Sequence, residues 1–493
     1  MKAAQSFRTA FIPILIALGL CEFVAAFETS MVYAAMSKLV QEFGDPAMAG
    51  WLVTGYFLMG AGTAAVIGRF GDIYGRRSVI LMMLALGLVG SLISAFSTNF
   101  TTVLAGRLIQ GFTAAMIPLC FGLIREHLPE RWVSLGVGLI VSAAGAGTVS
   151  ALLIGGIIVD NFPWRTIFTV SVILTAVSIV ASWAFIPKSH RQAVPDRPDY
   201  VGGLLYVPGI ALALLAISKG TSWGWTSATT IGCLLASLVF LGGWVFQSLR
   251  HPTPLVNVRL FANRNILLAN IAMSLLGLGA LQIILVFSLL LQQPEWTGAG
   301  LGASATGSAI AITPSNIVAL AAGPLAGIIA FARGDRTAVF VAGLITAVGW
   351  FGSLWLSDTV LQVTIILIVV AFGTAMAFAA LPNVVVKAAP LDRTSEAVGM
   401  MQVMRATCMS AGAQLVAVLL AVDGVVDPDT GAKYPSRASY ELVFSLIGAL
   451  CLAVCIIALF LKQREPAGNT PPIDELRFRE GMGEAAPTEQ LPG

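Results

Sequence analysis

The sequence predicts an all-α polytopic membrane protein. Of its 493 residues, 57% are apolar and only 11% are charged, whereas a soluble globular domain has roughly 25% charged residues. The apolar residues gather in runs of about 20, the length that a helix needs to cross a bilayer. Backbone groups in hydrocarbon must be satisfied within their own segment, and the runs lack the period-two alternation of a membrane barrel, so we expect helices. This composition excludes a soluble enzyme, a nucleic-acid-binding protein and a secreted disulfide scaffold.

Fourteen apolar runs, separated by charged or turn-forming residues, are long enough to span a membrane. The first run follows Lys2 and Arg8, and because no small-residue cleavage site comes after it, we interpret it as a span rather than a signal peptide. The expected spans are about 11–35, 49–67, 78–97, 100–124, 133–159, 165–186, 200–218, 229–249, 265–291, 303–332, 337–356, 359–386, 395–422 and 440–461.

Positive charge lies mainly on one side of this arrangement. Most of the 28 Lys and Arg residues fall in the termini and in the even-numbered loops. The positive-inside rule then places both termini in the cytoplasm.

Two charged connectors, 187–199 and 250–264, divide the spans into six, two and six. The expected units are an N-terminal set at 1–186, a linker with two additional spans at 187–264, and a C-terminal set at 265–461. The tail, 462–493, is rich in Pro, Gly and Glu and is expected to be disordered. The six cysteines lie in apolar runs without metal spacing, so we expect them to hold neither a metal nor a disulfide. We also expect no cofactor.

The turn between the second and third spans has a distinctive spacing, and it reads Gly68-Arg-Phe-Gly-Asp72-Ile-Tyr-Gly75-Arg76-Arg77. Its glycines allow close helix approach, and Asp72 can pair with Arg76 or cap a neighbouring helix. Each residue alone would suit a basic loop that only sets topology. The whole GxxxDxxGRR spacing resembles the signature loop of the major facilitator superfamily. That resemblance implies two six-helix bundles that rock about a central cavity, with this loop latching them at the cytoplasmic side.

Other segments resemble the same family. Arg107 to Ala115 is similar to its RxxQGxxxA segment, whose arginine is tied to proton coupling. Its WRxxF pattern matches Trp164 to Phe168. The Gly220 to Trp225 turn and the two extra spans resemble the fourteen-spanner drug–proton antiporter branch. A weaker echo of the signature loop, from Gly323 to Arg336, lacks the acidic residue at the expected spacing.

The fifth span departs from the pattern of that branch. Its relatives carry a GPxxGG segment, whereas this chain reads Ala151-Leu-Leu-Ile-Gly155-Gly156. Because the leading glycine and the proline of that segment are absent, the direction of transport and the substrate class each have a second interpretation. Gly147, Gly155 and Gly156 remain candidates for a hinge, and close helix packing is the equally good alternative.

Charges within spans are costly and need a reason. Glu28 aligns with the acidic residue of the resembling branch, and we expect it to face the cavity with Arg107 as its partner. Glu22 lies six residues earlier, roughly 120° around the helix, and is either the second titrating group or faces a helix neighbour. A buried ion pair that only fixes packing is the alternative for these charges.

A further set of polar residues lies in the C-terminal spans. They are candidates for hydrogen bonding to substrate in the cavity, or for joining helices to one another. The set consists of Arg405, Gln402, Asn270, Gln282, Asn316 and Asn383.

The resemblance implies a proton-coupled secondary transporter of small amphipathic molecules, an efflux antiporter working by alternating access as a monomer in the bacterial cytoplasmic (inner) membrane. The alternative is proton-coupled uptake or release of an organic or aromatic acid or other metabolite. An enzyme is not expected, because no span holds a nucleophile–base pair or a metal cluster. A primary pump would need the GxxxxGK[ST] loop, which is missing.

Overall fold

The computed structural model describes residues 11–43, 46–188, 199–427 and 433–462. Lys2 and Arg8, most of the 187–199 connector, part of the loop before the last span and the tail beyond 462 lie outside these residues.

Helices dominate the described chain, with one short antiparallel hairpin that pairs Val425 with Tyr434. The elements are α2 (Ile12–Phe43), α3 (Pro46–Tyr74), α4 (Arg76–Ala95), α5 (Phe100–Gln110), η1 (Gly111–Ala115), α6 (Met116–His127), α7 (Glu130–Asn161), α8 (Thr166–Phe185), α9 (Tyr200–Trp223), α10 (Ala228–Arg250), η2 (Val258–Ala262), α11 (Arg264–Leu278), η3 (Ala280–Gln282), α12 (Ile283–Gln292), η4 (Glu295–Thr297), α13 (Ala305–Ala319), α14 (Ala322–Arg333), α15 (Asp335–Gly352), α16 (Val360–Ala388), η5 (Leu391–Arg393), α17 (Thr394–Leu420), β1 (Gly424–Val426), β2 (Lys433–Pro435) and α18 (Arg437–Leu459).

Each apolar run that the sequence predicts to span is helical. By length and composition, 13 helices of the described chain can cross a membrane. The remaining predicted span is α15, which begins with Asp335 and Arg336, and these two charges lower its mean hydropathy. Three predicted spans are interrupted: η1 separates α5 from α6, η3 separates α11 from α12, and α13 ends just before α14. Such breaks are tolerated where neighbouring helices cover the backbone.

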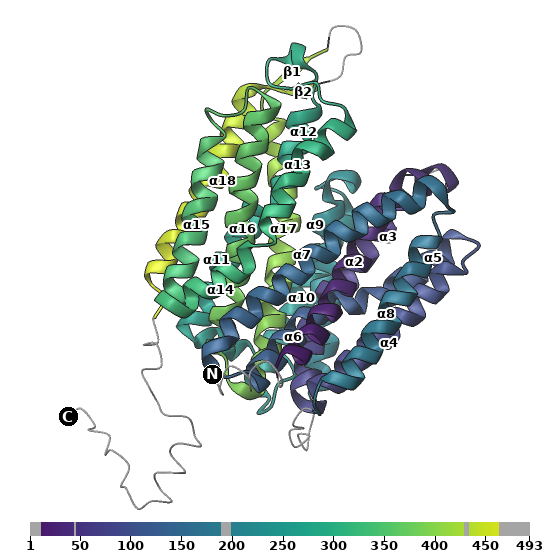
Figure 1. Ribbon diagram of the computed structural model, residues 1–493, viewed down its shortest axis with the longest axis vertical. Coiled ribbons are helices and arrows are strands. Elements are labelled where there is room, and N and C mark those ends of the chain that lie inside the picture. Colours follow the sequence, from purple (N-terminus) through teal and green to yellow (C-terminus); the bar gives the residue numbers. More distant parts are fainter. Residues whose placement is uncertain (1–10, 44–45, 189–198, 428–432, 463–493) are drawn as a thin grey trace, which may run out of the picture.

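The helices form two groups (Figure 1). The first bundle contains α2 to α8 and the second contains α11 to α18. They meet at one end, where α3 and α6 contact α17 and α7 contacts α14, and they separate toward the end that carries β1 and β2. We call the meeting surface the seam, the first end the latch end and the second the hairpin end. The two extra helices, α9 and α10, pair with each other, and α9 also contacts α3 and α17 beside the seam.

Candidate functional site

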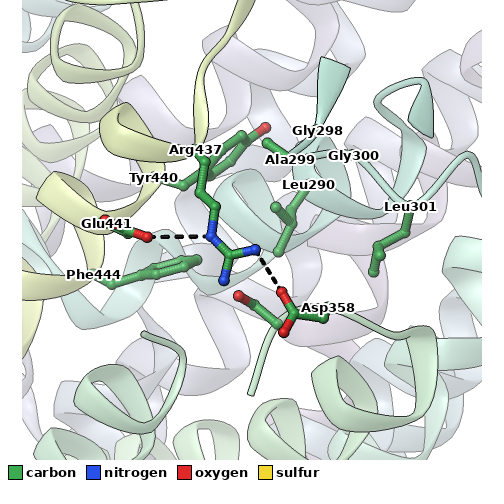
Figure 2. A pocket seen from close by; sticks show the side chains of 11 residues that line it. Leu290, Gly298, Ala299, Gly300, Leu301, Asp358, Arg437, Tyr440, Glu441 and Phe444 are labelled. Carbon is green, nitrogen blue, oxygen red and sulfur yellow. Dashed lines mark hydrogen bonds and ion pairs between the residues drawn. The ribbon is translucent and has the colours of Figure 1, made fainter. Parts of the chain in front are cut away.

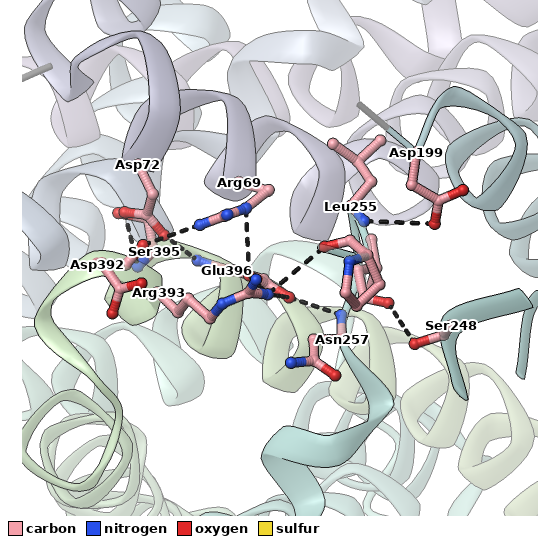
Figure 3. Close-up of polar contacts among 12 residues, drawn as sticks. Arg69, Asp72, Asp199, Ser248, Leu255, Asn257, Asp392, Arg393, Ser395 and Glu396 are labelled. Atoms are coloured by element: carbon pink, nitrogen blue, oxygen red, sulfur yellow. Dashed lines mark hydrogen bonds and ion pairs between the residues drawn. The ribbon is translucent and has the colours of Figure 1, made fainter. Parts of the chain in front are cut away.

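Asp72 joins the two bundles at the latch end (Figure 3). Its carboxylate accepts the backbone N–H groups of Ser395 (3.3 Å) and Glu396 (3.0 Å), in the first turn of α17. It also forms an ion pair with Arg76 at 2.7 Å. A carboxylate at a helix N-terminus binds free N–H groups and the positive end of the helix dipole. Both contacts expected for Asp72 are therefore present.

Arg76 extends this link across the seam. It donates to the Ser395 hydroxyl and to the Leu391 carbonyl, each at 2.9 Å, and pairs with Glu126 at 2.7 Å. Arg77, by contrast, donates to the Trp183 carbonyl within the first bundle.

The glycines of the turn have distinct tasks. A Cβ at Gly68 would collide with the Ser395 carbonyl, so this position sets how closely α3 approaches α17. Gly75 has a φ of 93°, which favours glycine, and it ends α3 so that α4 begins at Arg76.

Glu396 is a second centre of the latch end, and it is fully buried. Its carboxylate pairs with Arg69 of the first bundle (3.7 Å) and Arg393 (3.0 Å). It also accepts the N–H of Asn257, at 2.6 Å, from the connector between α10 and α11. We call Arg69, Asp72, Arg76, Ser395 and Glu396 the latch.

Sequence reasoning missed Arg69, Ser395 and Glu396 as latch residues. The run Asp392-Arg-Thr-Ser-Glu396, which has the composition of a helix start, was the available signal.

The α14–α15 turn meets α7 in a different way. It repeats the glycine spacing of the first turn, with Gly327 and Gly334 in place of Gly68 and Gly75, and Gly334 has a φ of 86°. Phe331 stands at the position of Asp72, and its ring stacks on Trp132 of α7 with centroids 6.1 Å apart. As the sequence indicates, this turn has no acid at the position of Asp72, and an aromatic contact takes its place.

A polar link accompanies the α14–α15 turn. Asp335 pairs with Lys387 (2.9 Å) and accepts the side-chain amide of Asn383 (2.5 Å). The same amide donates to Ser134 of the first bundle at 2.9 Å. Asn383, expected as a cavity residue, thus belongs to the seam at the latch end.

Glu28 lies inside the first bundle, surrounded by hydroxyl groups. Thr113 (2.6 Å), Ser171 (2.8 Å), Ser91 and Thr175 (both 3.2 Å) donate to its carboxylate from η1, α8 and α4. Its side chain is fully buried. The expected orientation of Glu28 toward a cavity between the bundles is wrong, because α4 and α8 lie on the side of α2 away from the second bundle.

Arg107 is also fully buried, but it does not form an ion pair with the Glu28 carboxylate. Its guanidinium donates to the backbone carbonyls of Glu28 (2.9 Å) and Leu52 (3.1 Å) and lies over the Tyr56 ring, 4.4 Å from the centroid. The expected pairing is thus replaced by backbone contacts that join α5 to α2 and α3.

Glu22, rather than Glu28, interacts with a charged group of the second bundle. It is 5% exposed, one of its oxygens is buried without a hydrogen-bond partner, and its charged neighbour is Arg405 of α17 in the second bundle. Arg405 accordingly interacts electrostatically with Glu22, although no direct ion pair forms between them. The Arg405 guanidinium donates to Gln402 (3.0 Å) and lies 5.1 Å from the Phe378 ring centroid.

The remaining polar candidates mostly join helices. Gln282 donates to the carbonyls of Gly277 and Met409, and so ties η3 to α17. Asn270 is fully buried and donates to Ile266 of its own helix. Asn316 is partly buried. Only Gln402 and Arg405 of the expected set lie together.

The hairpin end is held by separate charge contacts. In the first bundle, Glu42 accepts the Trp164 indole N–H and the Arg165 guanidinium, the latter at 2.6 Å. Partial burial acts to raise the pKa of the Glu42 carboxyl, but these hydrogen bonds outweigh it, so this pKa lies below its usual value of 4.5. In the second bundle, Arg437 bridges Asp358 (2.6 Å) and Glu441 (3.2 Å) beside a small pocket of about 80 Å³ (Figure 2).

Comparison with known proteins identifies the family to which this chain belongs. The sequence pattern that describes the Major Facilitator Superfamily matches residues 18–413 of this chain. The chain belongs to this superfamily. Its members are membrane transporters and not enzymes, so the bundles, the seam and the latch are parts of a transporter.

Relatives within the superfamily include exporters. A tetracenomycin C resistance and export protein of Streptomyces glaucescens is 23% identical over 93% of this chain and 93% of its own length. A multidrug resistance protein B homolog of Mycobacterium tuberculosis is 28% identical over 67% of this chain and 61% of its own length.

Solved structures share the fold. A human organic anion transporter aligns with a TM-score of 0.66 at 14% identity, over 90% of this chain and 99% of that one. A proton:xylose symporter of the superfamily, bound to a bromodeoxyglucose, aligns with a TM-score of 0.64 at 13% identity, over 92% of this chain and 97% of that one.

Proposed function

We propose that this superfamily member is a proton-coupled antiporter that exports small amphipathic molecules by alternating access. In this proposal it acts as a monomer with fourteen spans, divided at 1–186, 187–264 and 265–461, in a bacterial cytoplasmic (inner) membrane. Both termini and the latch end face the cytoplasm, and the proton gradient is the energy source. The drug-resistance and export functions named for two relatives support the direction of transport.

The observation that carries the proposal is that the buried Glu22 of α2, in the first bundle, interacts electrostatically with Arg405 of α17, in the second. One group lies in each bundle, so rocking of the bundles changes the distance between them and the water around both. The proton affinity of a carboxyl depends on burial and on nearby positive charge. A proton affinity that differs between the two states is what coupling requires.

Glu28 and Arg107 take a supporting part in this proposal. Their contacts lie within the first bundle, so rocking of the bundles as rigid bodies leaves them largely unchanged. The hydroxyl groups around Glu28 still make a second proton site chemically feasible. A test must therefore separate Glu22 from Glu28.

Three variants of one helix make that test. Glu22→Gln, Glu28→Gln and Glu42→Gln each replace a carboxyl of α2 by an amide, and Glu42 lies away from the seam. Each protein is reconstituted in liposomes, and pH-gradient-driven transport of cationic dyes, anionic dyes and aromatic acids is measured beside equilibrium binding.

We expect Glu22→Gln to abolish gradient-driven accumulation while it retains substrate binding, and Glu42→Gln to transport normally. If Glu22→Gln accumulates substrate normally and Glu28→Gln does not, the coupling site lies among the hydroxyl groups of the first bundle. If both variants accumulate substrate normally, proton coupling through α2 is excluded.

The alternative function is proton-coupled transport of an organic or aromatic acid. It is favoured by Arg405, whose two terminal nitrogens make no hydrogen bond within the described part of the chain, and by the altered segment at 151–156. The anionic members of the panel decide between the two. Transport that is confined to acids and lost in Arg405→Gln would support this alternative.

A further inference from the structure

A pocket of about 1110 Å³ opens at the latch end, on the seam. In the first bundle, its walls come from the end of α6 and the start of α7. In the second bundle, they come from the starts of α11 and α15 and from the ends of α14, α16 and α18. It is distinct from the latch, because none of the five latch residues lines it.

The pocket is strongly cationic. Its lining contains six cationic side chains against the two carboxylates of Glu130 and Asp335, and Asp335 is already paired with Lys387. The cationic residues are Arg125, Arg131, Arg264, Arg336, Lys387 and Lys462.

Three of these arginines have guanidinium groups available for a ligand. Among the residues that the structure describes, the side chains of Arg131, Arg264 and Arg336 make no hydrogen bond or ion pair. Arg131 belongs to the first bundle, whereas Arg264 and Arg336 belong to the second. A guanidinium group is well suited to a phosphate, which accepts paired N–H donors, and three such groups from both bundles line this pocket.

One wall of the pocket continues into an apolar surface. Leu325, Ile328 and Phe331 follow one another at intervals of three along α14 and are 39%, 52% and 53% exposed. Residues three apart share a helix face, so an apolar stripe runs along α14 to the pocket, which Phe331 itself lines. A phosphate with an attached acyl chain uses both features, whereas free phosphate uses only the charge.

We propose that this pocket binds the headgroup of an anionic phospholipid, with its phosphate on Arg131, Arg264 and Arg336 and an acyl chain along the α14 stripe. Cationic pockets between helices on the cytoplasmic side are suited to such headgroups. The headgroup contacts both bundles and stabilises the arrangement in which the latch end is closed. This effect on the states rests on the proposed function, but binding itself does not.

The experiment measures lipid binding to the full-length purified protein in detergent, by native mass spectrometry and by thermal unfolding. The probes are phosphatidylglycerol, phosphatidylcholine and inorganic phosphate. The test variant is Arg131→Gln with Arg336→Gln. The matched control is Lys188→Gln with Arg259→Gln, which removes two positive charges from the same end but outside the pocket. No step requires transport, so failure of the transport proposal leaves this test intact.

We expect phosphatidylglycerol to bind saturably and to raise the unfolding temperature of the native and control proteins, while phosphatidylcholine does neither. In the test variant the half-saturating concentration should rise about fivefold for each charge removed. Equal binding to test and control variants would overturn the pocket assignment. An equal stabilisation by inorganic phosphate would assign the pocket to a free anion instead of a lipid.

Discussion

The two turns that meet the seam share a glycine spacing but use opposite chemistry. The α3–α4 turn presents Asp72 to α17, and the α14–α15 turn presents Phe331 to α7 at the same position. The difference follows from where the facing helix begins. Ser395 lies against Gly68 in the first turn of α17, so its N–H group is free to bind a carboxylate.

On the other side, Ser134 lies against Gly327 but follows the start of α7 at Glu130 by four residues. Its N–H group is already bonded within the helix, so an acid there would not find the free backbone N–H groups that Asp72 binds. An acidic residue is therefore useful where it meets a helix N-terminus, and an aromatic ring serves where it meets the side of a helix. At this one position, the first turn depends on charge and the second on shape.

The largest effect is expected from enlarging the α14–α7 contact. A Cβ at Gly138 would collide with the Gly323 carbonyl, backbone against backbone, so neither side can yield. Overpacking of this kind costs about 1–3 kcal/mol, and we expect Gly138→Val to lower transport about tenfold or more by preventing closure of the latch end. Rates in liposomes measure this.

Gly156→Val is the matched control for that change. Gly156 lies on the same helix, and nothing within 4 Å would meet its Cβ. Its rate should stay near that of the native protein. An equal loss in both variants would show that α7 needs its glycines for flexibility, as in the hinge prediction for Gly147, Gly155 and Gly156, and not for the contact with α14.

The next effect is expected from neutralising the charged turn. Asp72→Asn weakens two N–H contacts to α17 and leaves the buried Arg76 without one of its carboxylates. Hydrogen bonds to charged groups contribute about 1.5–3 kcal/mol, so closure of the latch end should weaken about tenfold. Protein insertion should be unchanged. Transport rates, together with labelling of a cysteine placed in the seam, check this expectation.

Phe331→Ala tests the apolar turn. Phe331 is 53% exposed, and an aromatic pair contributes about 0.5–1.5 kcal/mol. We expect at most a few-fold loss of transport. A loss equal to that of Asp72→Asn would contradict the distinction between the two turns.

The smallest effect is expected from a charge contact that does not cross the seam. The pKa of the Glu42 carboxyl is lowered in the folded protein. Glu42 therefore contributes to stability when the pH is above the usual pKa of a glutamate, and this contribution is lost as the pH falls through the lowered pKa of the folded state. Because it is more than one third exposed, Glu42→Gln should cost less than about 1 kcal/mol. Thermal unfolding between pH 7 and acidic pH should show a smaller pH dependence for the variant. An unchanged dependence would assign the acid sensitivity to other groups.

Much of the fold could be predicted from the sequence, because helices in a bilayer need long apolar runs and the runs are separated by charge. Helix capping by Asp72 was predicted as one of two alternatives, beside a pair with Arg76, but the sequence did not indicate which helix it caps. The orientation of α2 was not predictable. The spacing of Glu22 and Glu28 fixes the angle between them but not which of them faces the second bundle. That choice is made by Ser91, Ser171 and Thr175, which come from α4 and α8 and are unremarkable in the sequence.

The central claim is that the charged turn, more than the aromatic one, holds the bundles together at the latch end. Spin labels at Lys188→Cys, just after α8 of the first bundle, and at Arg264→Cys, at the start of α11 in the second, allow the distance across this end to be measured by pulsed electron resonance once the native cysteines are replaced. We expect Asp72→Asn to move most of the population to longer distances and Phe331→Ala to move only a minor part. Equal shifts in the two variants, or a larger shift in Phe331→Ala, would contradict the account.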